Sequence, residues 1–157
     1  MKSVLISIQP KWCELIASGK KTIEVRKTKP KIDTPFKCYI YCTEKDYDKV
    51  FYIDKFMHKI FLNGNGKQKV IGEFVCDAII RHCEMANADI AEQQGCIKRE
   101  KLLEYANGKE LYGWHISDLV IYDKPKELSE FIVERYPCLA RLKRPPQSWC
   151  YVEGGDE

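Results

Sequence analysis

The sequence predicts an α+β domain built on a curved sheet that is mixed or mostly antiparallel. Three observations predict this class: strand-like segments outnumber helical ones, they surround two or three short helices, and the two kinds of segment do not alternate regularly. A doubly wound nucleotide-binding fold is therefore disfavoured. With 157 residues, of which 45% are hydrophobic, the chain has the size of one folded unit, so we expect a single domain over residues 1–157.

The N-terminal residues predict a strand that leads into a short helix. The first nine residues include a run of branched aliphatic side chains, with Ile6 and Ile8 on one face and Leu5 on the other. Pro10 suits the first turn of a helix, because its missing N–H would be unpaired there in any residue. Gly19 is a natural C-terminal cap for this helix.

The segment after the cap predicts a strand with two different faces. Ile23 and Val25 point to one side, whereas Thr22, Glu24 and Arg26 point to the other. The second face is entirely polar. Such a face needs either solvent or a ligand as its partner.

Further elements are predicted downstream: strands at 36–43, 69–83, 111–125 and 148–153, a helix at 96–108 and a helical turn at 126–132. Gly72 predicts an irregularity in the second of these strands. Asn107 and Gly108 mark the end of the helix.

Residues 44–69 are predicted to be an insertion between two strands. Within it, the stretch DKVFYIDKFMHKIF predicts one helix, and LNGNGKQK predicts a flexible turn. The aromatic density of the first stretch suits a partner-binding surface as well as a lid packed on the domain. A partner-binding or regulatory role is therefore one hypothesis.

Positive charge is concentrated near the N-terminus. The net charge is +3, yet residues 1–37 carry nine lysines and arginines against three acids, a balance of +6, and the remaining 120 residues sum to −3. A local positive field on a nearly neutral body suits an anionic ligand. The isoelectric point near 8.3 lies below the range that by itself indicates nucleic-acid binding.

The eight cysteines do not predict a disulfide framework, because most lie inside apolar runs of a chain with enough core to do without one. We expect reduced thiols. The N-terminal apolar run is only about five residues long before Pro10, too short for a signal peptide or a membrane span, which favours a cytoplasmic location. No C-x-x-C or H-x-x-x-H spacing occurs, so neither a metal nor a cofactor is indicated.

Four stretches together resemble the ASCH domain family: SIQPKWCELIASGKKTIEVRK, VIGEFVC, GWHISDLVIYDKPKELSEF and RPPQSWCYVE. The most specific piece is SGKKTIEVR, since members of the family carry a G-x-K-T-x-[ET]-x-R element after the first helix. The resemblance covers almost the whole chain apart from roughly residues 44–69. It implies a PUA-like pseudo-barrel with short flanking helices, in which the helix–strand element borders a cleft for RNA or a modified nucleoside.

The residues of this element carry the chemistry that such a cleft requires. A guanidinium binds phosphate bidentately, an ammonium adds a mobile positive charge, and a carboxylate accepts a hydrogen bond from a base amino group. We therefore predict binding of RNA or a nucleotide through a basic cleft formed by Lys20, Lys21, Thr22, Glu24, Arg26 and Lys27. The alternative is an edge strand whose polar face is simply solvated, with Glu24 and Arg26 paired to neighbours.

A small hydrolase is the second functional hypothesis. Some relatives in the family that the chain resembles hydrolyse acetylated cytidine, and others are reported to cut RNA. The resemblance places a catalytic lysine at Lys21, but Glu24 stands where the amidohydrolases carry a second threonine, so their hydroxyl nucleophile is missing. Thr22 or a water would have to replace it, with Glu24 as general base and Lys21 stabilising the oxyanion. A further catalytic glutamate of these relatives has no motif match here, and Glu73 is the candidate for it.

Two other groups of residues have a structural and a functional interpretation. Trp114 lies in an apolar strand, where packing is the more usual role than stacking on a base. Arg141, Lys143 and Arg144 form a second basic cluster, which either contacts phosphates or is a solvated surface run.

Overall fold

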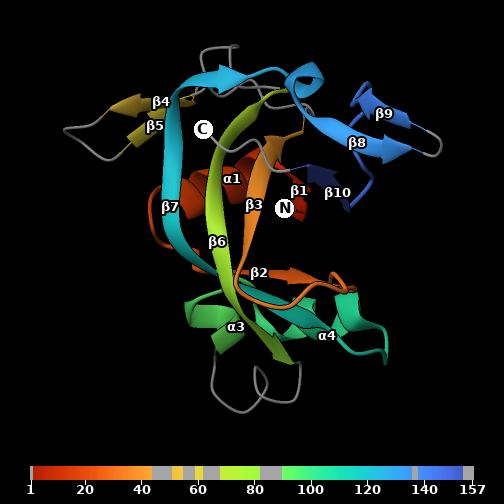
Figure 1. Cartoon of the computed structure of the whole chain (residues 1–157). Helices are drawn as coiled ribbons and strands as arrows, with labels where there is room; N and C mark the ends of the chain where they lie inside the picture. The colour runs from red at the N-terminus through yellow and green to blue at the C-terminus, as the bar shows by residue number, and fades with distance from the viewer. Residues whose placement is uncertain are drawn as a thin grey trace.

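The computed structural model describes residues 2–43, 51–54, 59–61, 68–81, 90–135 and 138–153. At its centre is one curved six-stranded sheet with the strand order β10-β1-β3-β6-β7-β2 (Figure 1). The strands are β1 (Lys2–Ile8), β2 (Ile23–Arg26), β3 (Phe36–Cys42), β6 (Val70–Arg81), β7 (Tyr112–Lys126) and β10 (Trp149–Glu153). Because β1 and β3 are parallel and the other neighbours are antiparallel, the predicted mixed sheet is confirmed.

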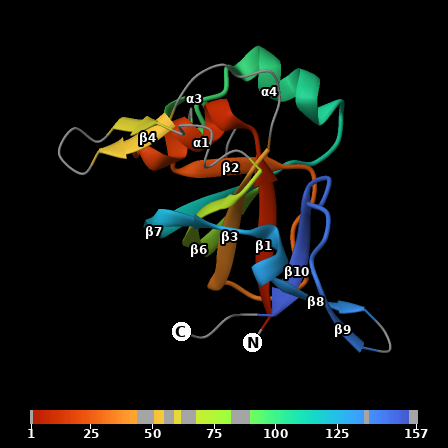
Figure 2. The same cartoon turned by 90° about the horizontal axis from the view of Figure 1, so that it is seen from above.

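Short helices and two small hairpins flank the sheet. The helices are α1 (Pro10–Ala17), α3 (Ile90–Gln93) and α4 (Arg99–Ala106), with a 3-10 turn, η1, at Leu128–Glu130. The hairpins pair β4 (Phe51–Asp54) with β5 (Lys59–Phe61) and β8 (Ile132–Arg135) with β9 (Cys138–Arg141). Figure 2 shows α4 beside β2 at one end of the curved sheet and the β8–β9 hairpin at the other. The predicted α+β class is confirmed.

The first strand and helix form as the sequence predicts. Ile6 and Ile8 belong to one buried hydrophobic cluster, whereas Leu5 belongs to a second cluster on the opposite face of the sheet. Pro10 occupies the first turn of α1. Gly19 follows the cap residue with a φ of +80°, a conformation that glycine adopts without steric cost.

Gly72 allows the sheet to bend sharply between β6 and β7. The register of the two strands shifts between Val70 and Gly72, as the predicted irregularity requires. A Cβ atom at this position would collide with the carbonyl oxygen of Val120. The close approach of the two backbones therefore needs a residue without a side chain.

The two end strands of the sheet, β2 and β10, approach each other through side chains. The Arg26 guanidinium donates to the carbonyl oxygen of Ser7 over 2.6 Å and to Ser148 Oγ over 3.2 Å. The Trp149 indole N–H donates to Thr28 Oγ1 over 2.9 Å. We call this junction, between residues 26–31 and 148–151, the seam. It closes the sheet into the pseudo-barrel.

Part of the prediction for residues 44–69 is wrong. Residues 51–54 and 59–61, where one helix was expected, form the antiparallel strands β4 and β5. Phe51, Tyr52 and Ile53 have high strand propensity, and the helical spacing of apolar residues did not outweigh it. The turn expected at residues 62–69 lies mostly outside the described residues. The prediction also missed α3 and the β8–β9 hairpin.

The described part of the chain contains no helix of the length and hydrophobicity that a membrane span requires.

Candidate functional site

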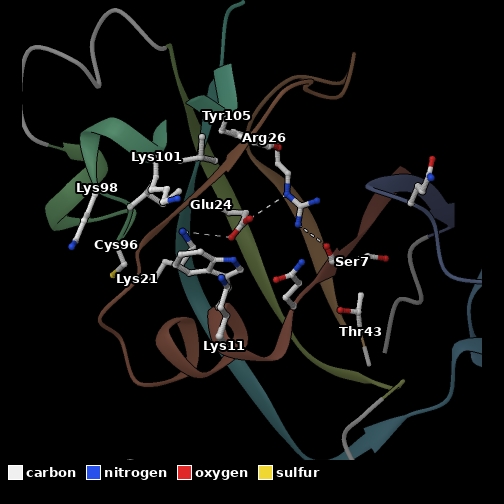
Figure 3. A pocket seen from close by; sticks show the side chains of 15 residues that line it. Ser7, Lys11, Lys21, Glu24, Arg26, Thr43, Cys96, Lys98, Lys101 and Tyr105 are labelled. Atoms are coloured by element: carbon white, nitrogen blue, oxygen red, sulfur yellow. Dashed lines mark hydrogen bonds and ion pairs between the residues drawn. The ribbon is translucent and has the colours of Figure 1, made fainter. Parts of the chain in front are cut away.

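One cavity of about 780 Å³ opens between α1, β2 and α4 (Figure 3). Fifteen residues line it: Ser7, Gln9, Lys11, Trp12, Lys21, Glu24, Val25, Arg26, Thr43, Cys96, Ile97, Lys98, Lys101, Tyr105 and Gln147. Five of the side chains are cationic and one is acidic, so the lining is strongly positive. A volume of this size is within the range of small-molecule sites.

The packing of β2 explains why its polar face lines this cavity. Ile23 and Val25 pack in a cluster with Leu102 and Ala106 of α4. Since successive strand residues point to opposite faces, this contact leaves the intervening Glu24 on the other face of β2, outside the apolar cluster. Its carboxylate is only 7% exposed, so the polar face of β2 is buried and not solvated.

Glu24 is the centre of a network of three buried charged groups. Its Oε1 lies 3.2 Å from Arg26 Nε, and its Oε2 lies 3.7 Å from Lys21 Nζ. The side chains of Lys21 and Arg26 are 1% and 12% exposed. Oε2 is buried and accepts no hydrogen bond from the residues that the structure describes. The three groups together carry one net positive charge.

Lys21 is held in place by contacts on several sides. Its ammonium donates a hydrogen bond of 2.5 Å to the carbonyl oxygen of Gly95 and lies 4.8 Å from the centre of the Trp12 ring. Burial lowers the pKa of Lys21 from its usual value of 10.5, and the negative charge of Glu24 opposes this effect. Lys21 is therefore easier to deprotonate than an exposed lysine.

The structure brings together half of the predicted site residues. Lys21, Glu24 and Arg26 line the cavity, as Figure 3 shows. Lys20 and Lys27 are exposed and are not among the lining residues. Lys27 instead lies 4.7 Å from the ring centre of Tyr105, which does line the cavity.

Two residues considered for catalysis lie away from the cavity lining. The Thr22 hydroxyl is 3.5 Å from Gln94 Oε1, and Thr22 is not among the lining residues. Glu73 on β6 pairs with Lys37 over 3.3 Å. Neither residue is placed to act on a ligand in this cavity.

The helices contribute lining residues that the sequence did not predict: Lys11 and Trp12 from α1, Lys101 and Tyr105 from α4, and Lys98 just before α4. The only signal for the second group was the basic run KREK at residues 98–101. Nothing in the sequence indicates that this run faces β2 across a cavity, because the two segments lie more than seventy residues apart.

The other groups singled out from the sequence lie elsewhere. Trp114 is fully buried in the core, so the expected packing role is confirmed. Arg141, Lys143 and Arg144 are exposed and are not among the lining residues. Seven cysteines of the described residues are free thiols, and no cluster of potential metal ligands occurs among these residues.

A curved mixed sheet that closes into a pseudo-barrel with short flanking helices defines the PUA-like class of folds. A family model for the ASCH domain matches residues 6–126, and the chain belongs to this family. The match ends before η1 and β8. A search of curated proteins finds no significant match.

Solved structures agree with this assignment of the fold. The chain is similar to the ASCH protein of Zymomonas mobilis, with 19% identity and a TM-score of 0.63 over 96% of this chain and 87% of that one. A tyrosine-to-phenylalanine variant of the same protein gives a TM-score of 0.65 at 19% identity, covering 98% of this chain and 91% of that one. At this level of identity the likeness establishes the fold.

Proposed function

We propose that this ASCH domain binds RNA or a nucleotide in the cavity between α1, β2 and α4. The observation that carries the proposal is the charge of the lining, in which five cationic side chains accompany a single acid. Nucleic-acid phosphates are the abundant anions that such a surface attracts. Membership of a PUA-like family supports the same function. We also propose that residues 1–157 form one domain, in which residues 44–69 are an insertion. The proposed location of the protein is the cytoplasm.

The test is a titration of a fluorescently labelled single-stranded RNA at several salt concentrations. We expect the logarithm of affinity to fall linearly with the logarithm of salt concentration, with a slope set by the number of phosphates contacted. A duplex RNA and a free mononucleotide serve as comparison ligands. Absence of salt-sensitive binding to all three would refute the proposal.

Hydrolysis of a modified nucleoside is a second candidate, favoured by one specific observation. Lys21 is almost fully buried, has a lowered pKa and lies 3.7 Å from the Glu24 carboxylate. An ammonium and a carboxylate in such proximity suit oxyanion stabilisation and general-base catalysis. Because Thr22 lies off the cavity, a water would be the nucleophile.

The hydrolytic step proposed for an acetylated cytidine uses this water. Glu24 takes a proton from the water as its oxygen attacks the amide carbonyl, and Lys21 stabilises the negative charge on the carbonyl oxygen. The C–N bond then breaks, the leaving nitrogen receives the proton from Glu24, and acetate and cytidine are released. Chromatography after incubation with acetylcytidine tests this candidate. Turnover that persists unchanged in Lys21→Ala would refute it, as would no turnover at all.

A further inference from the structure

The cavity differs in character between its buried floor and its exposed rim. We call Lys21, Glu24 and Arg26 the floor, since these side chains are at most 12% exposed. The lining lysines that are exposed form the rim: Lys11, Lys98 and Lys101. Figure 3 shows Lys98 and Lys101 on the α4 side of the cavity and Lys11 on the α1 side. A nucleotide could enter with either its phosphate or its base toward the floor.

The floor is a poor site for a phosphate, because its cations are already engaged. Arg26 donates to the Ser7 carbonyl and to Ser148 Oγ at the seam and also contacts Glu24. Lys21 donates to the Gly95 carbonyl. A phosphate placed between these cations would lie against the Glu24 carboxylate, and repulsion between two anions is strong at a buried site.

The floor does offer a hydrogen-bond acceptor. Among the described residues Glu24 Oε2 is buried without a donor within hydrogen-bond distance, and Lys21 Nζ forms an ion pair with it at 3.7 Å. Buried polar atoms are nearly always paired, so this carboxylate oxygen is an acceptor that an N–H or O–H of a ligand can satisfy. Solvent scarcely reaches Oε2 without ligand, so ligand entry includes a small shift of the surrounding side chains.

Aromatic rings among the lining residues suit a planar base. Trp12 and Tyr105 both line the cavity, and an exposed lysine contacts each ring. Lys11 Nζ lies 4.7 Å from the Trp12 ring centre, and Lys27 Nζ lies 4.7 Å from that of Tyr105. Such contacts are weak at exposed sites, so a base can displace a lysine from its ring.

We propose that the cavity takes a nucleotide with the base inward. The base presents an N–H donor to Glu24 Oε2, and the 5′-phosphate lies at the rim lysines. The substrate class is a nucleotide whose base carries an exocyclic amino donor beside an unprotonated ring nitrogen, as the Watson–Crick edges of cytosine and adenine do. The acceptor of the base then faces the Lys21 ammonium. This inference rests on the proposed function and adds the orientation of the ligand.

The first experiment compares fragments of the ligand on the unmodified protein. Cytidine and adenosine 5′-monophosphates are titrated by calorimetry beside ribose 5-phosphate and inorganic phosphate. We expect a nucleotide to bind at least about tenfold more tightly than ribose 5-phosphate. One hydrogen bond to a charged group contributes enough binding free energy for a change in affinity of this size. Methylating the donor, as in N4,N4-dimethylcytidine 5′-monophosphate, should remove this advantage.

The second experiment changes the acceptor. We expect Glu24→Gln to weaken binding of cytidine 5′-monophosphate about tenfold and to leave ribose 5-phosphate unaffected. The matched control is Glu134→Gln, an exposed acid on β8 that pairs with Lys2 and lies outside the lining. Lys98→Ala should weaken the binding of the nucleotide and the binding of ribose 5-phosphate by the same factor. If Glu24→Gln does not fold, the methylated nucleotide on the unmodified protein still decides the question.

Two results would overturn the inference and spare the proposed function. Ribose 5-phosphate binding as tightly as the nucleotides would place the phosphate at the floor. Tighter binding of all phosphates to Glu24→Gln would show that the carboxylate repels the ligand. If neither the nucleotides nor the labelled single-stranded RNA bind, the proposed function fails together with this inference.

Discussion

The two basic segments of this chain look alike in sequence and differ completely in structure. Residues 20–27 and residues 141–144 both hold several lysines and arginines close together. In the first segment Lys21 and Arg26 are buried around Glu24, whereas Arg141 in the second is exposed and donates one hydrogen bond to the Ser129 carbonyl. The comparison teaches that charge density does not make a site. Enclosure by neighbouring elements does.

The largest expected effect is the loss of folding stability in Glu24→Ala, which alters the buried first segment. Removing the carboxylate leaves Lys21 and Arg26 buried without a counter-charge, and breaking a buried pair in this way costs about 3–5 kcal/mol. Urea denaturation followed by circular dichroism measures the loss. Glu104→Ala, which breaks an exposed pair with Lys101, should change stability by less than about 0.5 kcal/mol. Equal losses in both variants would show that the network is not effectively buried.

Arg26→Lys is expected to weaken the seam, with a smaller loss of stability than in Glu24→Ala. Lysine keeps the charge but cannot donate simultaneously to Ser7, Ser148 and Glu24, and hydrogen bonds from a charged donor contribute about 1.5–3 kcal/mol. Amide hydrogen exchange should therefore quicken along β10, at the seam. Arg141→Lys is the control, because its single contact lies on the surface. Unchanged exchange in Arg26→Lys would mean that other contacts close the barrel.

The next prediction concerns ligand affinity. The double variant Lys98→Ala, Lys101→Ala should weaken RNA binding about tenfold at moderate salt and reduce the salt slope by roughly 2, since two phosphate contacts are lost. Lys143→Ala, Arg144→Ala removes the same charge from the exposed segment and should leave the slope unchanged. Anisotropy titrations with labelled RNA measure both. Equal losses in both variants would place the phosphates outside the cavity.

The smallest effect is a dependence of stability on pH. The pKa of Lys21 in the folded state lies below its usual 10.5, so in the window between these values the unfolded chain binds more protons. Raising the pH through this window should increase stability, by at most about 1.4 kcal/mol per unit, and Lys21→Met should lack this increase. Urea denaturation of both proteins up to pH 10.5 measures the difference. If stability rises by the same amount with pH in Lys21→Met, the increase comes from a titratable group other than Lys21.

Much of the fold could be predicted from the sequence, because local signals agreed with tertiary structure. The alternation of Ile23 and Val25 with polar residues set the faces of β2, and the proline and glycines set the limits of α1. Prediction failed at β4, where helical and strand signals competed over a few aromatic residues. It also missed β8 and β9, which are only four residues long each.

Within the candidate site, only the residues that lie in or just before β2 could be predicted from the sequence. Lys21, Glu24 and Arg26 lie within one periodic segment, so their shared surroundings follow from strand geometry. Lys98, Lys101 and Tyr105 reach the same cavity from α4, and only the packing of Leu102 and its neighbours against β2 brings them there. Such contacts between distant segments leave no periodic trace in a single sequence.

Arg26 belongs both to the wall of the cavity and to the junction that holds the barrel shut. Ligand occupancy and barrel opening are therefore thermodynamically linked through one guanidinium. A molecule that binds only the closed form would stabilise it by RT ln(1 + L/Kd), where L is the free ligand concentration, so the melting temperature would rise with the logarithm of ligand concentration once the site is saturated.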